Sequence, residues 1–466
     1  MFSYRLLILN FLFAVISSCQ KEEKEVIAVP QWSDSEISAE GGTTFDFSIN
    51  AFGHSLPDLP LDQKIKFGAG NALFRDNWVL SPSSTTGRDG LGPMYNSISC
   101  SGCHFKDGRG RPPEEGGSLA TMLIRLSIPE MDASGAHLPD ANYGFQFNNN
   151  AIPGVVPEGD VKVKYIEFTG AYPDGEKYSL RKPLFEFLGL GYGPLHSAIQ
   201  TSPRVAQQLP GLGFLEAISD NTIIAFSDEN DTNADGISGR PNYIYDSVSK
   251  KRHIGRFGWK ANQVSIKSQV IAAFNGDMGI SSNGSPELNL TLNQRKNYPE
   301  LKLESIDITD STLDKVIFYC STLSVPARRS PEQGLVMEGK KLFVEIGCHN
   351  CHRTEVKTGI HPQIPQLSNK LIHPYTDLLL HDMGDLLADQ RPDHSANGNE
   401  WRTPPLWGLG LLQTVSNHTY LLHDGRARNF EEAILWHGGE AQKATAGFKA
   451  LTKSERSAVL HFLESL

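Results

Sequence analysis

A five-residue pattern, C-x-x-C-H, occurs twice in this chain and constrains it more than any other feature. The copies occupy residues 100–104 and 348–352, so they take up four of the six cysteines in 466 residues. Two thiols on one helical turn can form thioethers with the two vinyl groups of a haem, and the histidine that follows can bind its iron. The pattern therefore predicts two covalently attached haems c.

The predicted attachment residues are Cys100, Cys103 and His104 at the first site, and Cys348, Cys351 and His352 at the second. A zinc site built from the two C-x-x-C pairs is the alternative. Zinc does not require a histidine directly after each pair, and the pairs lie much further apart than the usual zinc spacing. The pattern therefore favours haem.

The sequence around each pattern predicts a mainly α fold with two cytochrome c-like haem domains. Residues 339–352 read G-x-x-L-F-x-x-x-G-C-x-x-C-H, and residues 70–74 repeat its beginning ahead of the first pattern. Between the patterns, residues 161–181 alternate like a β-hairpin around a Pro-Asp-Gly turn. We therefore expect the first domain, residues 46–328, to carry a large β-containing insertion and the second to span 329–466.

The N-terminus predicts export. Arg5 precedes an apolar run over residues 6–16 that is too short to span a bilayer comfortably. The run ends in Val-Ile-Ser-Ser-Cys, which resembles a bacterial lipobox, so residues 1–19 form a lipoprotein signal and Cys19 is acylated. An ordinary signal peptide with an incidental cysteine is the alternative. Residues 20–45 would then be a flexible tether, and the protein a lipid-anchored periplasmic or outer-membrane lipoprotein of the bacterial cell envelope.

Charge and hydropathy exclude two broad classes. The chain has 43 Lys and Arg against 53 Asp and Glu, a formal net charge of −10, so no basic excess exists to neutralise nucleic-acid phosphates. After the N-terminal run, no apolar stretch is long enough to cross a membrane. We expect no nucleic-acid partner, and contact with a membrane only through the lipid anchor.

A short helix near the C-terminus supplies a candidate sixth ligand. Asn429 can cap it, and Phe430, Ala433, Ile434 and His437 share one face. A histidine on such a face is usually a satisfied core residue, but a haem domain that still lacks a ligand favours His437 as that ligand. The remaining cysteine, Cys320, falls on the apolar face of a helix predicted over residues 310–323 and is expected to be a small buried side chain.

An acidic loop predicts a calcium site. Asp231, Asn233 and Asp235 alternate before Gly236, as in the first half of an EF-hand loop. The bidentate glutamate of such loops is missing, since Asn242 stands at its position; Asp228 or Ser238 could complete the shell. A plain acidic turn is the alternative.

Several further segments carry a resemblance to one family. They are residues 89–93, 107–110, 211–218, 235–240, 255–261, 402–406 and 422–427. With the two haem patterns, they make the chain resemble the bacterial di-haem c-type oxidoreductases, also described as di-haem peroxidases or thiol oxidoreductases. That family is related to di-haem cytochrome c peroxidase and to the methylamine dehydrogenase maturation enzyme.

The resemblance implies a distal ligand for the second haem. In the peroxidase relatives that ligand lies fourteen residues after the histidine of an F-H-D-G-like turn, and is Met, or Tyr in the maturation enzyme. Fourteen residues after His423 stands His437. A bis-histidine haem should have a lower potential than a His/Met haem. The related peroxidases also hold Ca²⁺ near the haem interface, which favours the calcium reading of the acidic loop.

The resemblance also implies a reaction centre at the first haem. Relatives place a tryptophan between the haems, a glutamine ten residues later, and an acidic residue followed by Met-Gly on the distal side. Trp259, Gln269 and Asp277 look similar, although the last interval is two residues short. Asp277 would move a peroxide proton during O–O cleavage. Alternatively Met278 binds the iron and closes the site, or Asp277 caps a turn while Met278 packs in the core.

Together these features predict a peroxidase-like oxidoreductase. Electrons from a small redox protein or a quinone-linked donor would enter at the C-terminal haem and pass by way of Trp259. The N-terminal haem would react with peroxide, or oxidise an organic or protein substrate. The alternative is an electron-transfer cytochrome in which both haems are six-coordinate and no substrate reacts.

Overall fold

The computed structural model describes residues 37–132, 136–246, 251–302 and 305–466. The predicted signal, its Cys19 and most of the predicted tether lie outside these residues. The described residues from 37 to 466 belong to one compact unit, so the division at residue 328 stays a prediction. In the described end of the tether, Ala39 is fully buried and β1 (Thr43–Thr44) pairs with β11 (Val325–Pro326). The packed body therefore already includes residue 39.

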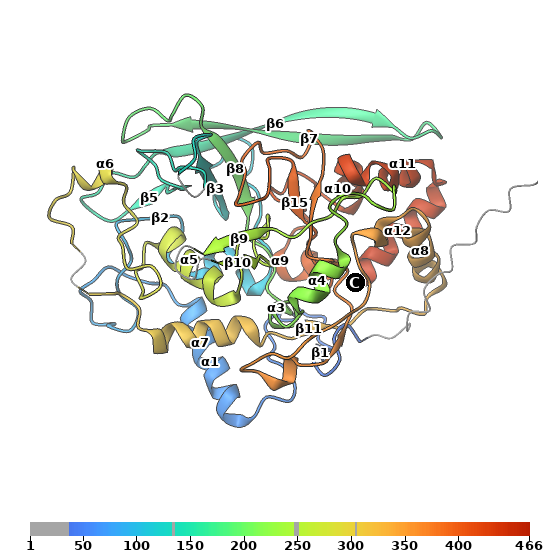
Figure 1. The fold of residues 1–466 in the computed structure, drawn as a ribbon, viewed down its shortest axis with the longest axis horizontal. Coiled ribbons are helices and arrows are strands. Elements are labelled where there is room, and N and C mark those ends of the chain that lie inside the picture. The colour runs from blue at the N-terminus through green and yellow to red at the C-terminus, as the bar shows by residue number, and fades with distance from the viewer. Residues whose placement is uncertain (1–36, 133–135, 247–250, 303–304) are drawn as a thin grey trace, which may run out of the picture. The chain divides into compact units, whose positions relative to one another are not determined.

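The elements follow one another as helices, short strands and one long hairpin (Figure 1). The first half contains β1, α1 (Leu61–Arg75), β2 (Met94–Tyr95), α2 (Cys100–Cys103), β3 (Met122–Ser127), β4 (Gln146–Phe147), β5 (Asn150–Ala151), β6 (Asp160–Ala171), β7 (Lys177–Leu188) and β8 (Gln200–Val205). Next come α3 (Leu212–Glu216), α4 (Asp220–Phe226), β9 (Tyr243–Asp246), β10 (Lys251–Ile254), α5 (Ile266–Met278), α6 (Leu292–Arg295), α7 (Asp310–Ser321) and β11.

The C-terminal part is α8 (Gly334–Glu345), β12 (Val356–Lys357), β13 (Leu371–Ile372), β14 (Leu380–Asp382), β15 (Glu400–Arg402), α9 (Leu412–Ser416), α10 (Phe430–Trp436), α11 (Gln442–Ala450) and α12 (Lys453–Ser465). In the part of the chain that the structure describes, 3-10 turns occur at 105–107, 348–350, 365–367, 409–411 and 439–441. No helix among the described residues is long and apolar enough to cross a membrane.

The prediction of a mainly α fold is wrong. Only 29% of the described residues are helical and 19% are in strands, so the class is mixed. The strands are spread over a three-stranded sheet, β4-β3-β8, and several two-stranded sheets. Many of these pair segments that are distant in sequence, such as β1 with β11, and a two-residue strand has no periodicity to detect. The periodicity of the sequence therefore revealed the helices but not the two-residue strands, which is why a mainly α fold was predicted.

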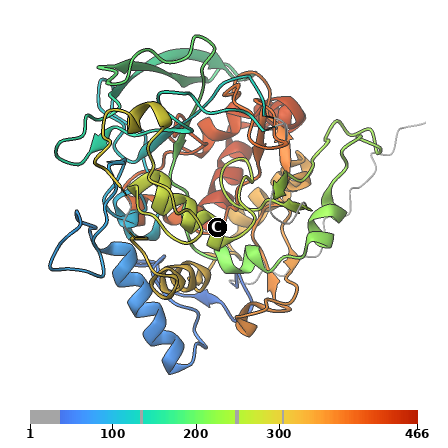
Figure 2. The same cartoon turned by 60° about the vertical axis from the view of Figure 1, so that its left-hand side comes forward.

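The hairpin predicted around residues 161–181 is confirmed. Strands β6 and β7 pair antiparallel over twelve residues each, from Asp160 opposite Leu188 to Ala171 opposite Lys177. The hairpin runs along one side of the compact unit in both views (Figures 1 and 2). The β3–β8 pair next to it reaches the first haem pattern, so the insertion contributes to that site.

Two helix pairs share one construction. A Cβ added at Gly70 of α1 would lie 2.1 Å from the carbonyl oxygen of Lys315 on α7, and one at Gly339 of α8 would lie 1.9 Å from that of Ala458 on α12. Only glycine permits backbones to approach so closely. Both glycines begin the repeated G-x-x-L-F sequence, so the pairs α1/α7 and α8/α12 are equivalent scaffolds behind the two C-x-x-C-H patterns.

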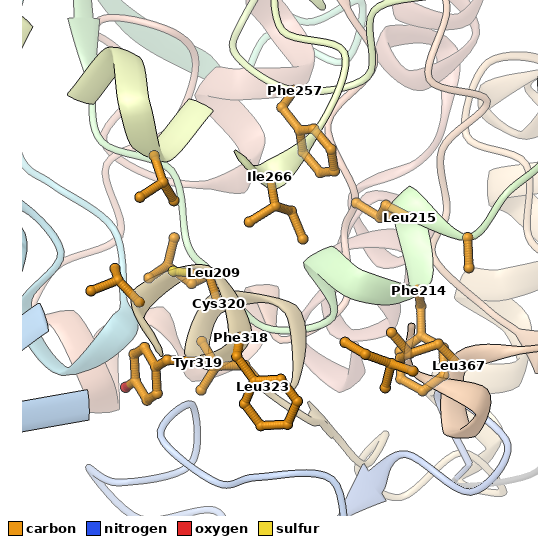
Figure 3. Close-up of a cluster of buried hydrophobic side chains, with 14 of the residues drawn as sticks. Leu209, Phe214, Leu215, Phe257, Ile266, Phe318, Tyr319, Cys320, Leu323 and Leu367 are labelled. Carbon is orange, nitrogen blue, oxygen red and sulfur yellow. The ribbon is translucent and has the colours of Figure 1, made fainter. Parts of the chain in front are cut away.

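The scaffold of the first pattern belongs to the largest apolar cluster. Residues of α3, α5 and α7 meet there, and Cys320 is 4% exposed within it, as the sequence predicted (Figure 3). The helix predicted over 310–323 is observed as α7, and Asn429 caps α10 by accepting a hydrogen bond from the Glu432 amide at 2.9 Å. These helices hold the haem patterns in place.

Candidate haem-binding sites

The residues predicted for the first haem line one cavity. Its walls come from α2, β3, β8 and α5, with residues 404 and 405 contributed from the C-terminal part of the chain. The predicted residues in its lining are Cys100, Cys103, His104, Trp259, Gln269, Asp277 and Met278. Segments more than a hundred residues apart in sequence therefore meet around the first C-x-x-C-H pattern.

The two cysteines of the first pattern lie in the wall of the cavity. Burial is the main cause that raises the pKa of Cys100 and of Cys103 to about 12, and the carboxyl of Asp277 adds to it. Ser99 caps their helix by accepting a hydrogen bond from the Gly102 amide at 3.2 Å. One helical turn therefore presents both sulfurs to the cavity.

The donor set fits a haem iron. The Nδ1 of His104 donates to the carbonyl oxygen of Gln207 at 2.7 Å, and burial lowers the pKa of His104 to about 4. The imidazole is therefore neutral, with its proton on Nδ1. Nε2 is left as the nitrogen that can bind a metal, and the bond to the carbonyl fixes the ring, as is usual for metal-binding histidines.

The second site repeats this arrangement twice. The Nδ1 of His352 donates to the carbonyl oxygen of Tyr375 at 2.9 Å, and that of His437 to the carbonyl oxygen of Ala433 at 2.6 Å. Burial lowers the pKa of His352 to about 4 and also lowers that of His437, and the two rings are close enough to influence each other electrostatically. The structure thus brings His437 to the second pattern with its Nε2 available.

Asp277 stands at the end of α5, and its carboxylate is oriented by a residue of the insertion. Gln146 donates from Nε2 to Asp277 Oδ1 at 2.8 Å and to Asn96 Oδ1 at 2.7 Å. Burial raises the pKa of Asp277, while Arg125 and the Gln146 hydrogen bond oppose the rise. Its neighbour Met278 is 2% exposed, packs in the core cluster and also lines the cavity.

Trp259 connects the cavity with the C-terminal part of the chain. Its indole Nε1 donates to the carbonyl oxygen of Val205 at 2.8 Å, and the guanidinium of Arg109 lies 4.9 Å from its ring. Val205 in turn donates from its amide to the carbonyl oxygen of His423, whose imidazole stacks on Trp401 at 3.8 Å. A continuous set of contacts therefore runs from the cavity to the turn that precedes α10.

Sequence reasoning missed the charge of the cavity. Four arginines are in its lining, Arg109, Arg125, Arg204 and Arg402, and Asp277 is the only acidic residue among the lining residues. Arg204 is paired with Asp393 at 3.0 Å, whereas the pKa of Arg125 is lowered by burial and supported by the charge of Asp277. Arg109 and Arg402 stand in segments that carry the family resemblance, whereas no motif marks Arg125 and Arg204, which the β3–β8 pairing brings together.

A second missed cluster lies beside the second pattern. The imidazole of His381 lies between Asp377, at 2.9 Å, and Glu440, at 2.6 Å, and its Nδ1 is 3.6 Å from the sulfur of Cys351. Burial would lower the pKa of His381, but Cys351 and Asp377 raise it well above its usual value. Cys351, Asp377 and His381 could together hold a metal ion if Cys351 were not attached to haem.

The predicted calcium loop is exposed and closed by its own hydrogen bonds. The carboxylate of Asp231 accepts from the Gly236 amide at 3.1 Å, and Asn233 Oδ1 accepts from the Asp235 amide at 2.9 Å. The ammonium group of Lys443 binds the backbone carbonyl oxygen of Asp235.

The residues considered for completing the calcium shell are engaged elsewhere. Asn242 is fully buried, and its side-chain oxygen accepts from the Ser395 amide at 3.0 Å. Ser238 donates to Glu440 at 2.9 Å, and Asp228 accepts from the Thr232 amide at 2.9 Å. The loop therefore presents three side chains rather than a complete calcium shell.

One family model matches most of the chain. It is described as "Di-haem oxidoreductase, putative peroxidase" and matches residues 32–126 and 148–466. A structure of hydrazine synthase from Kuenenia stuttgartiensis, pressurised with xenon, is 13% identical, covers 88% of this chain and 94% of its own, and gives a TM-score of 0.30. No curated protein matches the chain.

Proposed function

Because the chain belongs to the di-haem oxidoreductase family, we propose that it is a peroxidase-like enzyme with one reaction centre and one electron-entry centre. The observation that carries this proposal is the difference between the two C-x-x-C-H sites. A cavity with a hydrogen-bonded carboxyl, Asp277, adjoins the first, whereas at the second His437 lies close enough to His352 to lower its pKa electrostatically. One site is therefore suited to a reacting ligand and the other to electron transfer.

The haems of the family are held covalently in this proposal. Cys100 and Cys103 attach one, and Cys348 and Cys351 the other, with His104, His352 and His437 as iron ligands. A bound haem c supplies reversible electron storage and an iron at which the O–O bond of peroxide can be cleaved. The position of Cys100 and Cys103 in the cavity wall and the three imidazoles with bonded Nδ1 atoms support this assignment.

Asp277 handles the proton of the substrate. Gln146 binds its Oδ1, so Oδ2 is the oxygen that accepts a proton from peroxide and returns it to the departing oxygen. Burial raises the pKa of this carboxyl, and a pKa nearer to neutrality makes it a better acid and base. Gln269 lines the same cavity, and in this proposal its side-chain amide binds the peroxide oxygens.

Electrons enter at the C-terminal site and reach the cavity through Trp259. The contacts from Trp401 and His423 through Val205 to Trp259 support the part of this route that ends at the cavity. The donor is a small redox protein or a quinone-linked carrier, and the substrate is peroxide or an organic or protein molecule oxidised at the cavity.

The experiment is rapid mixing of the diferric protein with H₂O₂, combined with low-temperature EPR of the resting state. We expect high-spin iron from the N-terminal site, a fast spectral change, and turnover with an electron donor. No spectral change and no turnover with any donor would overturn the peroxidase proposal.

An electron-transfer cytochrome is the second candidate, because Met278 lines the same cavity and could bind the iron. Resting EPR would then show only low-spin iron. The variant Met278→Leu separates the two proposals: it should create a high-spin signal if Met278 is a ligand, and leave the spectrum unchanged if it packs in the core.

Location in the cell envelope is supported by the sequence alone. Acylation of Cys19 predicts that the protein partitions into membranes and that Cys19→Ala releases it into the soluble fraction. Equal release of both forms from cells with opened envelopes would contradict the anchor.

Calcium is the least supported part of the proposal. Asp231, Asn233 and Asp235 offer oxygens, but Lys443 already brings a positive charge to the loop. Terbium luminescence tests it: binding that calcium displaces, and that Asp231→Asn abolishes, would support the site. Absence of luminescence would show a plain acidic turn.

A further inference from the structure

The two equivalent scaffolds differ at one buried aromatic position. In the first, Phe74 of α1 lies 6.1 Å from the ring of His104 and 5.3 Å from the ring of Tyr319 on α7. In the second, Phe343 of α8 lies 6.2 Å from the ring of His352.

The partner of Phe343 on α12 is Phe462, 5.2 Å away. A Cβ added at Gly70 would meet Tyr319, and one at Gly339 would meet Phe462, so these two residues occupy equivalent positions. The phenolic hydroxyl is what the first scaffold has and the second lacks.

The structure provides a hydrogen-bond acceptor for that hydroxyl. The Tyr319 hydroxyl donates to Asp107 Oδ1 at 2.6 Å, and the two side chains are 0% and 7% exposed. Asp107 follows the first C-x-x-C-H pattern by three residues and has a positive φ of 62°, as does Lys106 with 53°. A non-glycine residue adopts this conformation only where the surroundings hold it there. The chain is thus bent to bring a carboxylate to the tyrosine.

The surroundings of Tyr319 favour loss of an electron. Its ring lies against Phe67, at 4.8 Å, and Phe74, and the next residue, Cys320, lines the haem cavity. A phenol gives up an electron easily only if its proton leaves at the same time, because the phenol radical cation is a very strong acid. Tyr319 therefore lies near the haem cavity, where the oxidant acts, and has a proton acceptor, Asp107, within hydrogen-bond distance.

Other aromatic residues near the sites are protected by cations. Arg109 lies over Trp259 at 4.9 Å, Lys260 over Trp401 at 4.4 Å and Arg426 over Trp436 at 4.8 Å. A positive charge on a ring face opposes the formation of a second positive charge in that ring.

Tyr172 is the tyrosine whose hydrogen bonding most resembles that of Tyr319. Its hydroxyl also donates to a carboxylate, Glu431, at 2.6 Å, but the guanidinium of Arg456 lies 3.8 Å from its ring. Among the cation contacts of the described rings, none is made to Tyr319.

We propose that Tyr319 and Asp107 form a proton-coupled electron donor to the N-terminal haem site. The inference rests on the proposed reaction with peroxide, which is the oxidant. Reduction of H₂O₂ to two molecules of water consumes two electrons and two protons, and solvent supplies these two protons. Tyr319 supplies one electron and moves its phenolic proton to Asp107, which yields a neutral tyrosyl radical and a protonated carboxyl. The other electron comes from the iron site, and reduction through Trp259 later restores both.

The pair has a protective use. When peroxide arrives before the electron donor, an oxidising equivalent stored on Tyr319 stays within one buried and reversible site. Without the pair, that equivalent would attack nearby side chains such as Cys320 or Met278, which line the cavity.

The test is freeze-quench EPR of the diferric holoprotein after mixing with H₂O₂. We expect a tyrosyl radical whose signal narrows when the protein contains ring-deuterated tyrosine. Tyr319→Phe should abolish it and should fold, because phenylalanine already occupies the equivalent position 462. Tyr172→Phe is the matched control and should leave the signal unchanged.

Asp107→Asn keeps the phenol but removes the proton acceptor, so the radical yield should fall while the Tyr319 ring remains. A second readout follows from the protective use: oxidation of Cys320 and Met278, measured by mass spectrometry after repeated peroxide exposure, should increase in Tyr319→Phe. A tyrosyl signal that persists in Tyr319→Phe, or no radical although peroxide reacts, would overturn this inference alone. No reaction of the wild type with peroxide would overturn the proposed function.

Discussion

The two C-x-x-C-H sites have the same scaffold behind the histidine and different surroundings in front of it. Behind, each has a helix pair that crosses at a glycine and a phenylalanine ring about 6 Å from the histidine ring, Phe74 at the first site and Phe343 at the second. In front, the first has a cavity with a carboxyl and arginines, and the second has another histidine, His437.

The difference lies in which segments supply the front of each site. Strands β3 and β8, from the long insertion, form the front of the first cavity, and Gln146 of the same insertion binds Asp277 there. At the second site a seven-residue helix, α10, leads into His437. An insertion can bring polar groups into a cavity without disturbing the helix pair behind it. A repeated scaffold therefore stands behind both C-x-x-C-H patterns, and the added segments make the two sites different.

Removal of the thiols gives the largest effect. Exchange of Cys348 and Cys351 for alanine should lower the covalent haem content from two to one per chain, and so should exchange of Cys100 and Cys103, because each pair attaches one haem. A pyridine haemochrome assay with the protein concentration measures this. Two haems in either variant, or zinc in place of haem, would refute the assignment of separate attachment sites.

Neutralising Asp277 should affect only the first site. Asp277→Asn keeps the size of the side chain and the contact with Gln146 but removes the proton acceptor, so the rate of reaction with H₂O₂ should fall by ~10²–10⁴-fold. Stopped-flow absorbance measures the rate, and the low-spin EPR signal of the C-terminal haem serves as the control. An unchanged rate would exclude Asp277 as the acid–base group.

The third effect concerns the potential of the second haem. A thioether ligand raises the potential relative to imidazole, so His437→Met should raise it by on the order of 100 mV. Redox titration followed by optical spectra measures this, and the potential of the first haem should not move by a comparable amount. A change confined to the first haem would place His437 at the wrong site.

Much of both sites could be predicted from local sequence. The attachment residues follow from spacing, and the helix face with its cap pointed to His437, which lies close to His352 in the structure. The family pattern selected Trp259, Gln269 and Asp277, and the structure puts all three in one cavity. Such signals are short or depend on a known pattern, so a single sequence carries them.

Groups that depend on long-range pairing could not be predicted. Gln146 meets Asp277 and Arg125 reaches the cavity only because β3 pairs with β4 and β8, and His381 meets Glu440 across fifty-nine residues. None of these residues stands in a recognisable motif. The mixed fold class was missed for the same reason, since its two-residue strands are defined by their partners.

The smallest predicted effect tests the turn that joins the two regions. Leu422 and His423 bind Arg109 and Val205 of the first cavity, and the next residue, Asp424, is paired with Arg426 at 2.8 Å. Burial would raise the pKa of Asp424, but Arg426 brings it down from 3.8 to about 2. The carboxylate therefore stabilises the fold above pH 4, and this contribution is lost as the pH falls from 4 towards 2.

A shift of this size corresponds to about 2 kcal/mol. The free-energy gap between wild type and Asp424→Asn, from urea unfolding, should be larger at pH 7 than at pH 2.5 by most of that amount. Asp62→Asn, an exposed carboxyl in the first turn of α1, is the control and should show no comparable change. If the gap does not depend on pH, Arg426 does not hold the carboxylate in its ionised form, and the turn is fixed by its backbone contacts to the first cavity alone.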